Sequence, residues 1–263
     1  MAYKVKVIPK VKHRATAPTN SHRTPYGLQV IENCLICPGI KEDFFCDLPK
    51  PSLTAIDAIS SSAVYPKDAI LFVEGQDPRG VFVLCNGRVK LSTTSADGKS
   101  IIVRIAEPGE VVGLAGTLSG RPYELTAEVL EPLQANFIPK EAFLQFLRDH
   151  SEAAVRVAEM MSGIYHATLL EVRYLGFSSS TAQKLARFLL DLPAHPGCNG
   201  HFRATLTLTH KEIGETIGAS RETVTRLFAN FKREGLVEVH GATIVIPDRS
   251  RLERETGVDP SLR

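Results

Sequence analysis

The sequence predicts an α+β chain in which a small all-β domain is followed by a long helix and then by a helical unit with a β-hairpin. Three features predict this order: regular glycines among β-rich runs in residues 64–139, a seven-residue apolar repeat in 154–175, and two capped helices around Gly218. With 263 residues, 43% of them hydrophobic, the chain is long enough for two domains.

Residues 1–30 carry six Lys or Arg and no acidic side chain, and they lack the apolar core of a secretory signal. They are expected to form a flexible basic arm. No apolar run approaches the 18 residues typical of a membrane span. Five cysteines without a secretory signal favour a cytoplasmic protein with reduced thiols.

Short β-rich runs fill the next part of the chain, among them AILFV, VFVLC, RVKLSTT, IIVRIA, EVVGL, ELTAEVL and LQANFI. Turn glycines stand at positions 75, 87, 98, 109 and 120, a spacing of 11 or 12 residues. This regularity is typical of a small sandwich or barrel. The pair Asp97-Gly98 predicts a tight hairpin turn.

Residues 140–176 have a helical pattern, and from 154 to 175 apolar or small residues recur in alternating steps of four and three. This spacing predicts a seam between two helices, and a second apolar flank can face the β-domain. The chain is therefore expected to be a homodimer. The expected seam residues are Ala158, Met161, Tyr165, Thr168, Val172 and Leu175.

After Gly176 a further helix is expected to end before Pro193, and 193–205 are expected to form a loop. Thr209 and Glu212 then form a capping-box pattern at the start of the next helix. Gly218 suits a left-handed helix end, and Ser220 can cap a second helix. Together these features predict a helix-turn-helix. The sequence LVEVHGATIVI adds a β-hairpin beside it.

The second of these helices begins with exposed polar residues that suit the major groove of DNA. An Arg side chain presents paired donors to guanine, and Glu accepts from cytosine. The candidate base-reading residues are Arg221, Glu222, Thr225 and Arg226. The candidate phosphate contacts, which position the protein without reading sequence, are Thr209, Lys211, Ser220, Lys232 and Arg233. Residues 201–233 contain six basic and three acidic side chains, which also favours a polyanionic partner.

Residues 31–247 resemble the CRP/FNR family of bacterial transcription regulators, most closely in IGETIGASRETVTRLFANFKREGLVEVHG. The resemblance implies a β-roll (jelly-roll-like) sensor domain, a dimerisation helix and a winged helix-turn-helix. The implied divisions are arm 1–30, sensor 31–150, dimer helix 151–176, DNA-binding domain 177–250 and tail 251–263. It further implies a homodimer that reads TGTGA-like half-sites in palindromic double-stranded DNA, and RNA polymerase as a partner.

The sequence argues against cyclic AMP as the effector. The family's nucleotide site uses a carboxylate followed by an Arg and a small hydroxyl residue. Here Leu114 occupies the carboxylate position, and Tyr123 and Glu124 stand where the Arg and hydroxyl residue belong. Glu124 would repel a phosphate, and Arg121 is displaced by two residues.

Cys34, Cys37 and Cys46 resemble the N-terminal cysteines of the oxygen-sensing FNR subgroup, which implies an iron–sulfur cluster. The fourth ligand stays open: Asn136 occupies the subgroup's usual position, and Cys85 is the alternative thiol. Asp43 or Asp47 can also complete the set. Zinc, a Cys34–Cys37 disulfide and inert buried thiols are competing interpretations. His195, Cys198 and His201 form a second cluster that is expected to be incidental.

An enzymatic β-domain of the cupin type would need inward-facing histidines, and the sequence has none between His22 and His150. No nucleophile elbow, P-loop or dinucleotide fingerprint is present in the sequence. The protein is therefore not expected to be an enzyme. Two alternatives remain: a β-roll receptor that acts through a protein partner, and a regulator that responds to a cyclic nucleotide.

Overall fold

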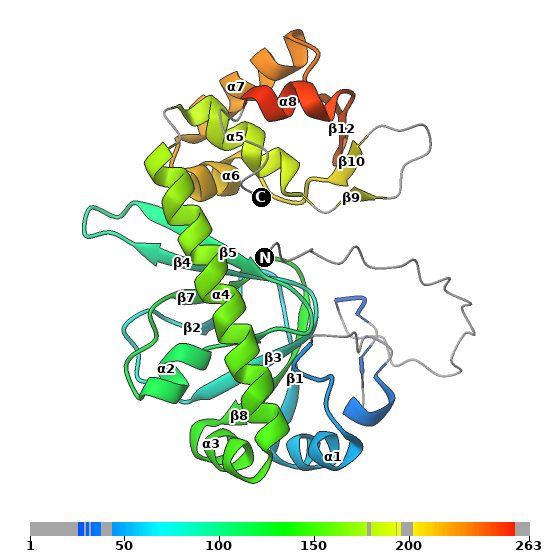
Figure 1. Cartoon of the computed structure of the whole chain (residues 1–263), viewed down its shortest axis with the longest axis vertical. Helices are drawn as coiled ribbons and strands as arrows, with labels where there is room; N and C mark the ends of the chain where they lie inside the picture. The colour runs from blue at the N-terminus through cyan, green and yellow to red at the C-terminus, as the bar shows by residue number, and fades with distance from the viewer. Residues whose placement is uncertain are drawn as a thin grey trace, which may run out of the picture.

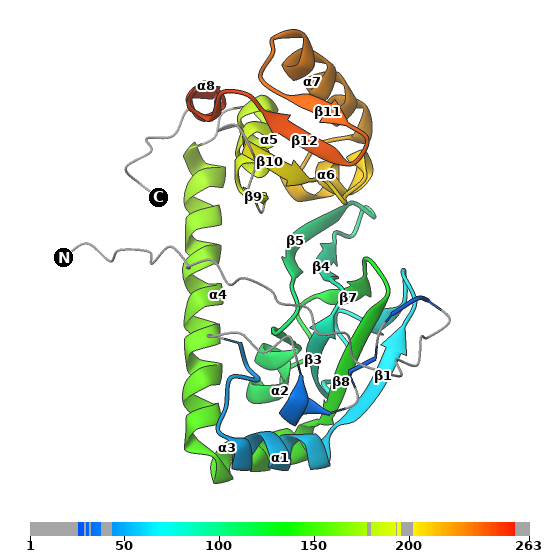
Figure 2. The same ribbon diagram turned by 90° about the vertical axis from the view of Figure 1, so that its right-hand side faces the viewer.

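The computed structural model describes residues 26–28, 30–31, 33–37, 44–177, 180–192, 194–195 and 202–255. A β-rich part and a smaller, mainly helical part lie at the two ends of the molecule (Figure 1). The long helix α4, Ser151–Phe177, runs beside both parts (Figure 2). The predicted α+β class and order of elements are confirmed.

Strands β1 to β8 form two antiparallel four-stranded sheets. The first sheet has the order β1 (Ser61–Tyr65), β8 (Leu133–Pro139), β3 (Gly80–Asn86) and β6 (Val111–Val112). The second has the order β2 (Ile70–Phe72), β7 (Thr126–Val129), β4 (Val89–Thr94) and β5 (Ser100–Ala106). All seven β-rich runs expected from the sequence are strands, while β1 and the short helix α2 (Leu114–Ser119) were missed.

Side-chain alternation along β3 builds two separate cores. Phe82 and Leu84 face the second sheet and join the core between the sheets. Val81 and Val83 face the other way, toward the helices. The helices on that side are α1 (Lys50–Ile59), α3 (Lys140–Asp149) and the first turns of α4, with the short 3₁₀ turn η1 (Cys34–Ile36) packed beside α1.

The five regularly spaced glycines at positions 75, 87, 98, 109 and 120 all have positive φ, between 69° and 91°. Four of them stand in turns between successive strands, and Gly120 ends α2, which lies between β6 and β7. Gly87 shows why a side chain is excluded, because a Cβ there would stand 2.6 Å from the carbonyl oxygen of Pro132.

The helical pattern of 140–176 is interrupted at His150, whose φ of −127° and ψ of 86° end α3. Ser52 of α1 explains the position of this break. Its hydroxyl lies 3.1 Å from His150 Nδ1 and also hydrogen bonds to Glu152, at the start of α4. The sequence pattern could not show this contact, because Ser52 is distant in the chain.

The smaller part contains α5 (Thr181–Leu190), α6 (His210–Ile217), α7 (Arg221–Arg233) and α8 (Arg249–Glu255). A four-stranded antiparallel sheet packs with them in the order β11 (Glu238–His240), β12 (Thr243–Ile246), β10 (Phe202–Thr205) and β9 (Ala194–His195). The hairpin expected around His240 and Gly241 is confirmed.

Two expectations for this part are corrected. The segment 193–205 contains β9 and β10 instead of being only a loop, because β10 pairs with β12 across a long sequence separation. Residues 251–255, expected in a tail, complete α8, because Leu252 is fully buried in the core of this part. Residues 256–263 and most of the basic arm lie outside the described residues.

Candidate nucleic-acid interface and thiol cluster

Local hydrogen bonds cap the starts of both α6 and α7, and a left-handed glycine ends α6. Thr209 Oγ1 accepts from the Glu212 backbone N–H at 3.3 Å, and the Thr209 backbone N–H donates to Glu212 Oε2 at 2.7 Å. Gly218 ends α6 with φ 70°, and Ser220 Oγ accepts from the Thr223 backbone N–H at 3.2 Å. These contacts are the capping interactions that the sequence predicts.

Gly214 allows α6 to pack closely against the turn that leads into α7. A Cβ at this position would lie 2.5 Å from the carbonyl oxygen of Ala219, a distance that real Cβ atoms do not tolerate. Behind the turn, Val224, Phe228 and Phe231 of α7 are buried in the core. Since one face of α7 is fixed in this way, its opposite face must point outward.

The four candidate base-reading residues, Arg221, Glu222, Thr225 and Arg226, are all exposed on the first turns of α7. The pKa of Glu222 is lowered, first by a hydrogen bond from its own backbone N–H and then by the Ser220 hydroxyl. The side chain is therefore an ionised acceptor at neutral pH. The arrangement offers two guanidinium donors and one carboxylate acceptor at one end of a helix.

The candidate phosphate contacts fall into separate places. Lys211 is exposed on the first turn of α6, and Ser220 stands at the start of α7. Lys232 and Arg233 occupy the last turn of α7, roughly 17 Å further along the helix at 1.5 Å per residue. The hydroxyl of Thr209 donates to Glu212 Oε2 at 2.8 Å, so its only proton is already used within the protein.

Helix α4 carries the expected seam on its outer side. Ala158, Tyr165, Thr168 and Val172 are exposed, with Tyr165 66% and Val172 60% accessible. Met161 is half-buried and packs with Ala153 and Val157 against the β-rich part. The side chain of Leu175 lies outside the described part. Figure 2 shows both folded parts on the same side of α4.

The nucleotide-like segment of the β-domain holds core residues. The Tyr123 hydroxyl donates to the Gly80 carbonyl at 2.6 Å and accepts from the backbone N–H groups of Arg79 and Gly80 at 3.1 and 3.2 Å. Its ring stacks on Phe72 with centroids 4.0 Å apart. Leu114 is buried, while Arg121 and Glu124 are exposed. Tyr123 is therefore a hydrogen-bonded core residue whose hydroxyl is fully engaged by the backbone of β3 and the residue before it.

Two amide side chains on β8 hold the N-terminal cysteine segment against the sheet. Gln134 accepts from the Ile31 backbone N–H and donates to the Ile31 carbonyl, both at 2.7 Å. Asn136 Nδ2 donates to Cys34 Sγ at 3.3 Å, while its buried Oδ1 has no hydrogen-bond partner among the described residues. These buried amides were a sequence signal for the thiol site, and their role was missed.

Cys46 and Cys85 approach the same face of the first sheet. Val83 of β3 is the register partner of Asn136, and Cys85 follows two residues later beside a bulge in this pairing. Cys46 packs against the core that contains Val83. Its neighbour Phe45 donates its backbone N–H to the Gly109 carbonyl, and the Gly109 N–H donates to the Leu84 carbonyl. Cys85 therefore lies on β3, and backbone hydrogen bonds tie the segment of Cys46 to the same strand, which pairs with β8 at Asn136.

Burial raises the pKa of the Cys34, Cys46 and Cys85 thiols to about 12. For Cys34 the next cause is a hydrogen bond with Asp57, and for Cys46 and Cys85 it is the charge of another thiolate of the group. Each of the four cysteines, Cys37 included, has such an interaction with the other three. The four candidate thiols therefore lie near enough to one another to interact electrostatically.

Four free, partly buried thiols and one unpartnered amide oxygen lie in this part of the β-domain, and thiols are the ligand type that soft metals prefer. In the described part of the chain, however, no three His, Cys, Asp or Glu side chains stand in position to hold a metal ion. Asp47 pairs with Arg156 at 3.2 Å instead of facing the thiols, while Asp43, Cys198 and His201 lie outside the described residues, as does the side chain of His195.

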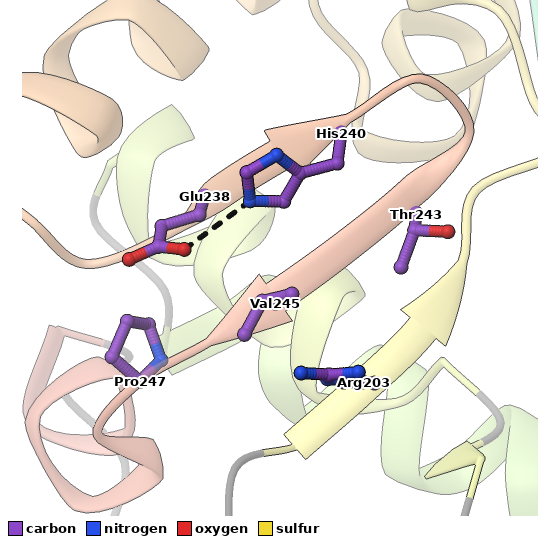
Figure 3. A pocket seen from close by; sticks show the side chains of 6 residues that line it. All are labelled: Arg203, Glu238, His240, Thr243, Val245 and Pro247. Atoms are coloured by element: carbon purple, nitrogen blue, oxygen red, sulfur yellow. Dashed lines mark hydrogen bonds and ion pairs between the residues drawn. The ribbon is translucent and has the colours of Figure 1, made fainter. Parts of the chain in front are cut away.

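A separate pocket of about 360 Å³ opens on the sheet of the smaller part (Figure 3). Its lining side chains are Arg203, Glu238, His240, Thr243, Val245 and Pro247. His240 Nε2 lies 3.3 Å from Glu238 Oε2, so these two polar side chains of β11 are directed at each other (Figure 3). The pocket lies on the β-hairpin and does not touch the thiol cluster.

Two family models match the chain. The Crp-like helix-turn-helix domain matches residues 183–255, and the cyclic nucleotide-binding domain matches residues 63–150. The chain belongs to the CRP/FNR family. It is accordingly a transcription regulator with a DNA-binding helix-turn-helix, and the family is one of regulators rather than enzymes.

Relatives of this CRP/FNR chain include the CRP-like cAMP-activated global transcriptional regulator of Mycobacterium tuberculosis. It is 26% identical over 192 residues, which cover 72% of this chain and 85% of the relative. The cAMP-activated global transcriptional regulator CRP of Escherichia coli O157:H7 is 25% identical over 184 residues, covering 69% and 87%.

Solved structures share the fold. FixK2 from Bradyrhizobium japonicum matches with a TM-score of 0.66 at 22% identity, covering 76% of this chain and 99% of FixK2. The c-di-GMP responsive regulator CLP of Xanthomonas campestris matches with a TM-score of 0.67 at 19% identity, covering 76% and 100%. The names of these similar proteins state different effectors, cAMP and c-di-GMP, so membership of the family does not identify the effector of this chain.

Within the described ranges, no helix combines the length and apolar character that crossing a membrane requires.

Proposed function

We propose that this CRP/FNR regulator acts in the cytoplasm as a homodimer on palindromic double-stranded DNA with TGTGA-like half-sites. The exposed, capped start of α7 carries the proposal, because it presents Arg221, Glu222, Thr225 and Arg226 together. Arg pairs with guanine through two hydrogen bonds, and an ionised Glu accepts from cytosine N4. Lys211 and Ser220 would contact phosphates near this end, and Lys232 and Arg233 at the other.

The seam on α4 supplies the two-fold axis in this proposal. Tyr165, Thr168 and Val172 are exposed in the single chain, and a second copy would cover them. Paired α7 helices would then reach successive major grooves about 34 Å apart. As a regulator of this type the dimer would also contact RNA polymerase.

Selection of sites from random DNA with the purified full chain tests base reading. Replacing Arg226 by Ala should cost about 1–3 kcal/mol on the preferred site and relax base preference at one position. Replacing Arg233 by Ala is the matched control, since a phosphate contact weakens binding to all sequences alike. Equal losses on all sequences for Arg226→Ala would exclude direct readout by this residue.

We further propose that the effector acts at the thiol cluster. Cys34, Cys37 and Cys46 would supply three ligands, and Cys85 would supply the fourth from β3, next to the strand where Asn136 replaces the usual cysteine. An iron–sulfur cluster held there would supply a redox-active group that is sensitive to oxidation. The protein's own part is to bury the thiols, to hold η1 against β8 through Asn136 and to connect the site to the core beneath α4.

Anaerobic purification followed by iron, sulfide and zinc assays tests this sensor. Bound iron and sulfide that are lost on exposure to air together with site-specific DNA binding would support the cluster. Cys85→Ser should abolish metal retention, while Cys198→Ser is a matched control in a separate segment. A metal-free protein that binds DNA equally before and after exposure to air would exclude the cluster as the effector. A different effector, such as a cyclic nucleotide, would then be the remaining hypothesis. If the protein does not bind DNA at all, the alternative function, a β-roll receptor that acts through a protein partner, would be favoured.

A further inference from the structure

Thr225 lies in the middle of the proposed reading surface, but its hydroxyl group is engaged within the protein. Thr225 Oγ1 donates to the Arg221 carbonyl oxygen at 2.9 Å, one turn earlier in α7. The same oxygen lies 2.9 Å from Nδ1 of His210, the first residue of α6. The side chain as a whole is exposed.

The number of protons fixes the direction of the second bond. A hydroxyl has one proton, and the Thr225 hydroxyl gives it to the Arg221 carbonyl. Thr225 Oγ1 must therefore accept from His210, which places a proton on His210 Nδ1. This assignment makes His210 a donor that holds the oxygen of Thr225 from the side of α6.

His210 is itself held in place. Its ring stacks on Phe228 with centroids 5.0 Å apart and an angle of 6° between the planes. Phe228 is buried in the core of the DNA-binding part. Both partners of the Thr225 hydroxyl are thus anchored, one in the backbone of α7 and the other on the core.

We propose that Thr225 reads DNA through its Cγ2 methyl group, which selects the C5-methyl of a thymine, and that His210 is the positioning residue that turns this methyl outward. A staggered side chain whose oxygen is fixed by two partners has its methyl at a different, fixed position. In the major groove the thymine methyl is the apolar group that such a side chain can contact. The inference rests on the proposed entry of α7 into that groove.

Deoxyuridine provides the test, because it differs from thymidine only by the missing C5-methyl. The preferred site of the full chain is first selected from random DNA, and each thymine of the half-site is then replaced in turn. One position should lose affinity by about fourfold, the effect of one methyl group leaving an apolar contact. Substitution at the other thymines should change affinity less than twofold.

Variants assign the effect to Thr225 and His210. Thr225→Ser keeps the hydroxyl and removes the methyl, so thymine and deoxyuridine sites should bind equally. Thr225→Val keeps a methyl group but removes the oxygen that His210 and the Arg221 carbonyl hold, so discrimination should fall below twofold, as in His210→Ala. His210→Ala should reduce discrimination below twofold, while His210→Asn, which retains a donor near the Nδ1 position, should restore it.

The outcomes separate this inference from the proposed function. A selected site that Arg226→Ala disrupts, together with equal binding of thymine and deoxyuridine at every position, would overturn the methyl contact alone. Full discrimination in Thr225→Ser would do the same, and full discrimination in His210→Ala would remove the role of His210. Failure to select any site would overturn both proposals.

Discussion

Arg88 of the β-rich part donates from Nη2 to Thr207 Oγ1, just before α6, at 2.6 Å. The same guanidinium pairs with Glu131 through Nε at 3.0 Å and Nη2 at 3.2 Å. Leu130 beside this pair is buried in the core of the DNA-binding part, and α6 lies against β5. Figures 1 and 2 both show α6 above the β4–β5 hairpin. The β-rich part and the DNA-binding part are therefore in direct contact beside α6.

Replacing Arg88 by Ala should weaken this contact. Loss of a charge-assisted hydrogen bond of about 1.5 kcal/mol should speed amide hydrogen exchange in α6 by roughly tenfold, because exchange follows local opening. Lys90→Ala is the matched control, since Lys90 of β4 pairs with Glu128 of β7 inside the β-rich part at 3.0 Å. Unchanged exchange in α6 of Arg88→Ala would show that the contact contributes nothing to docking.

Gly214→Ala should destabilise the DNA-binding part. Its Cβ would meet the Ala219 carbonyl at 2.5 Å, and backbone atoms cannot yield as a flexible side chain does. We expect a loss of roughly 1–3 kcal/mol in the free energy of unfolding, comparable to other overpacked sites. Thermal denaturation checks this. Gly163→Ala, in an open place on α4, should instead leave stability equal or slightly raised. A neutral Gly214→Ala would contradict the close approach of α6 and α7.

Tyr165→Asp should convert the proposed dimer to a monomer. Tyr165 is 66% exposed at the centre of the seam, and a carboxylate there would be buried beside its symmetry mate. Sedimentation at micromolar concentration should show half the mass, and DNA affinity should fall by at least tenfold. Ala167→Asp introduces the same charge at an exposed position that points away from the seam. Loss of the dimer in both variants, or in neither, would argue against this seam.

The metal-free protein should lose stability in alkaline solution. Since burial raises the pKa of Cys34, Cys46 and Cys85 from 9.0 to about 12, the folded state keeps thiol protons that the unfolded state releases. Stability from these groups is full below pH 9 and is lost as pH rises from about 9 to 12. Chemical denaturation at pH 8, 9 and 10 checks the slope, and Cys85→Ser should make it shallower. An identical slope in the variant would mean that Cys85 ionises equally in both states.

Helices α6 and α7 could be predicted from the sequence because the residues that begin and end each helix act locally. Thr209, Glu212, Gly218 and Ser220 each act within a few residues, and the structure shows every one in the expected conformation. The turn glycines of the β-domain are similar, since each sets the conformation of its own turn.

The missed features depend on residues far apart in the chain. Strand β1 is short and gains its partner from β8, about 70 residues away. The cysteine group is similar: spacing alone indicates Cys34 and Cys37, while Cys85 joins them only because β3 pairs with β8. The bond between His210 and Thr225 crosses the turn between two helices, so neither residue alone reveals it.

In the proposed dimer, the single helix α4 would enlarge small movements near the thiol cluster into larger displacements at its far end. Its first turns contribute Ala153 and Val157 to the same core as Cys46. With 27 residues, α4 is about 40 Å long at 1.5 Å per residue. A tilt of about 5° at its base, the size that a fraction of an ångström of repacking produces, would displace its far end by about 3.5 Å. That distance approaches the rise of one base pair, so a slight tightening around four sulfur atoms would suffice to change which phosphates a dimer can reach.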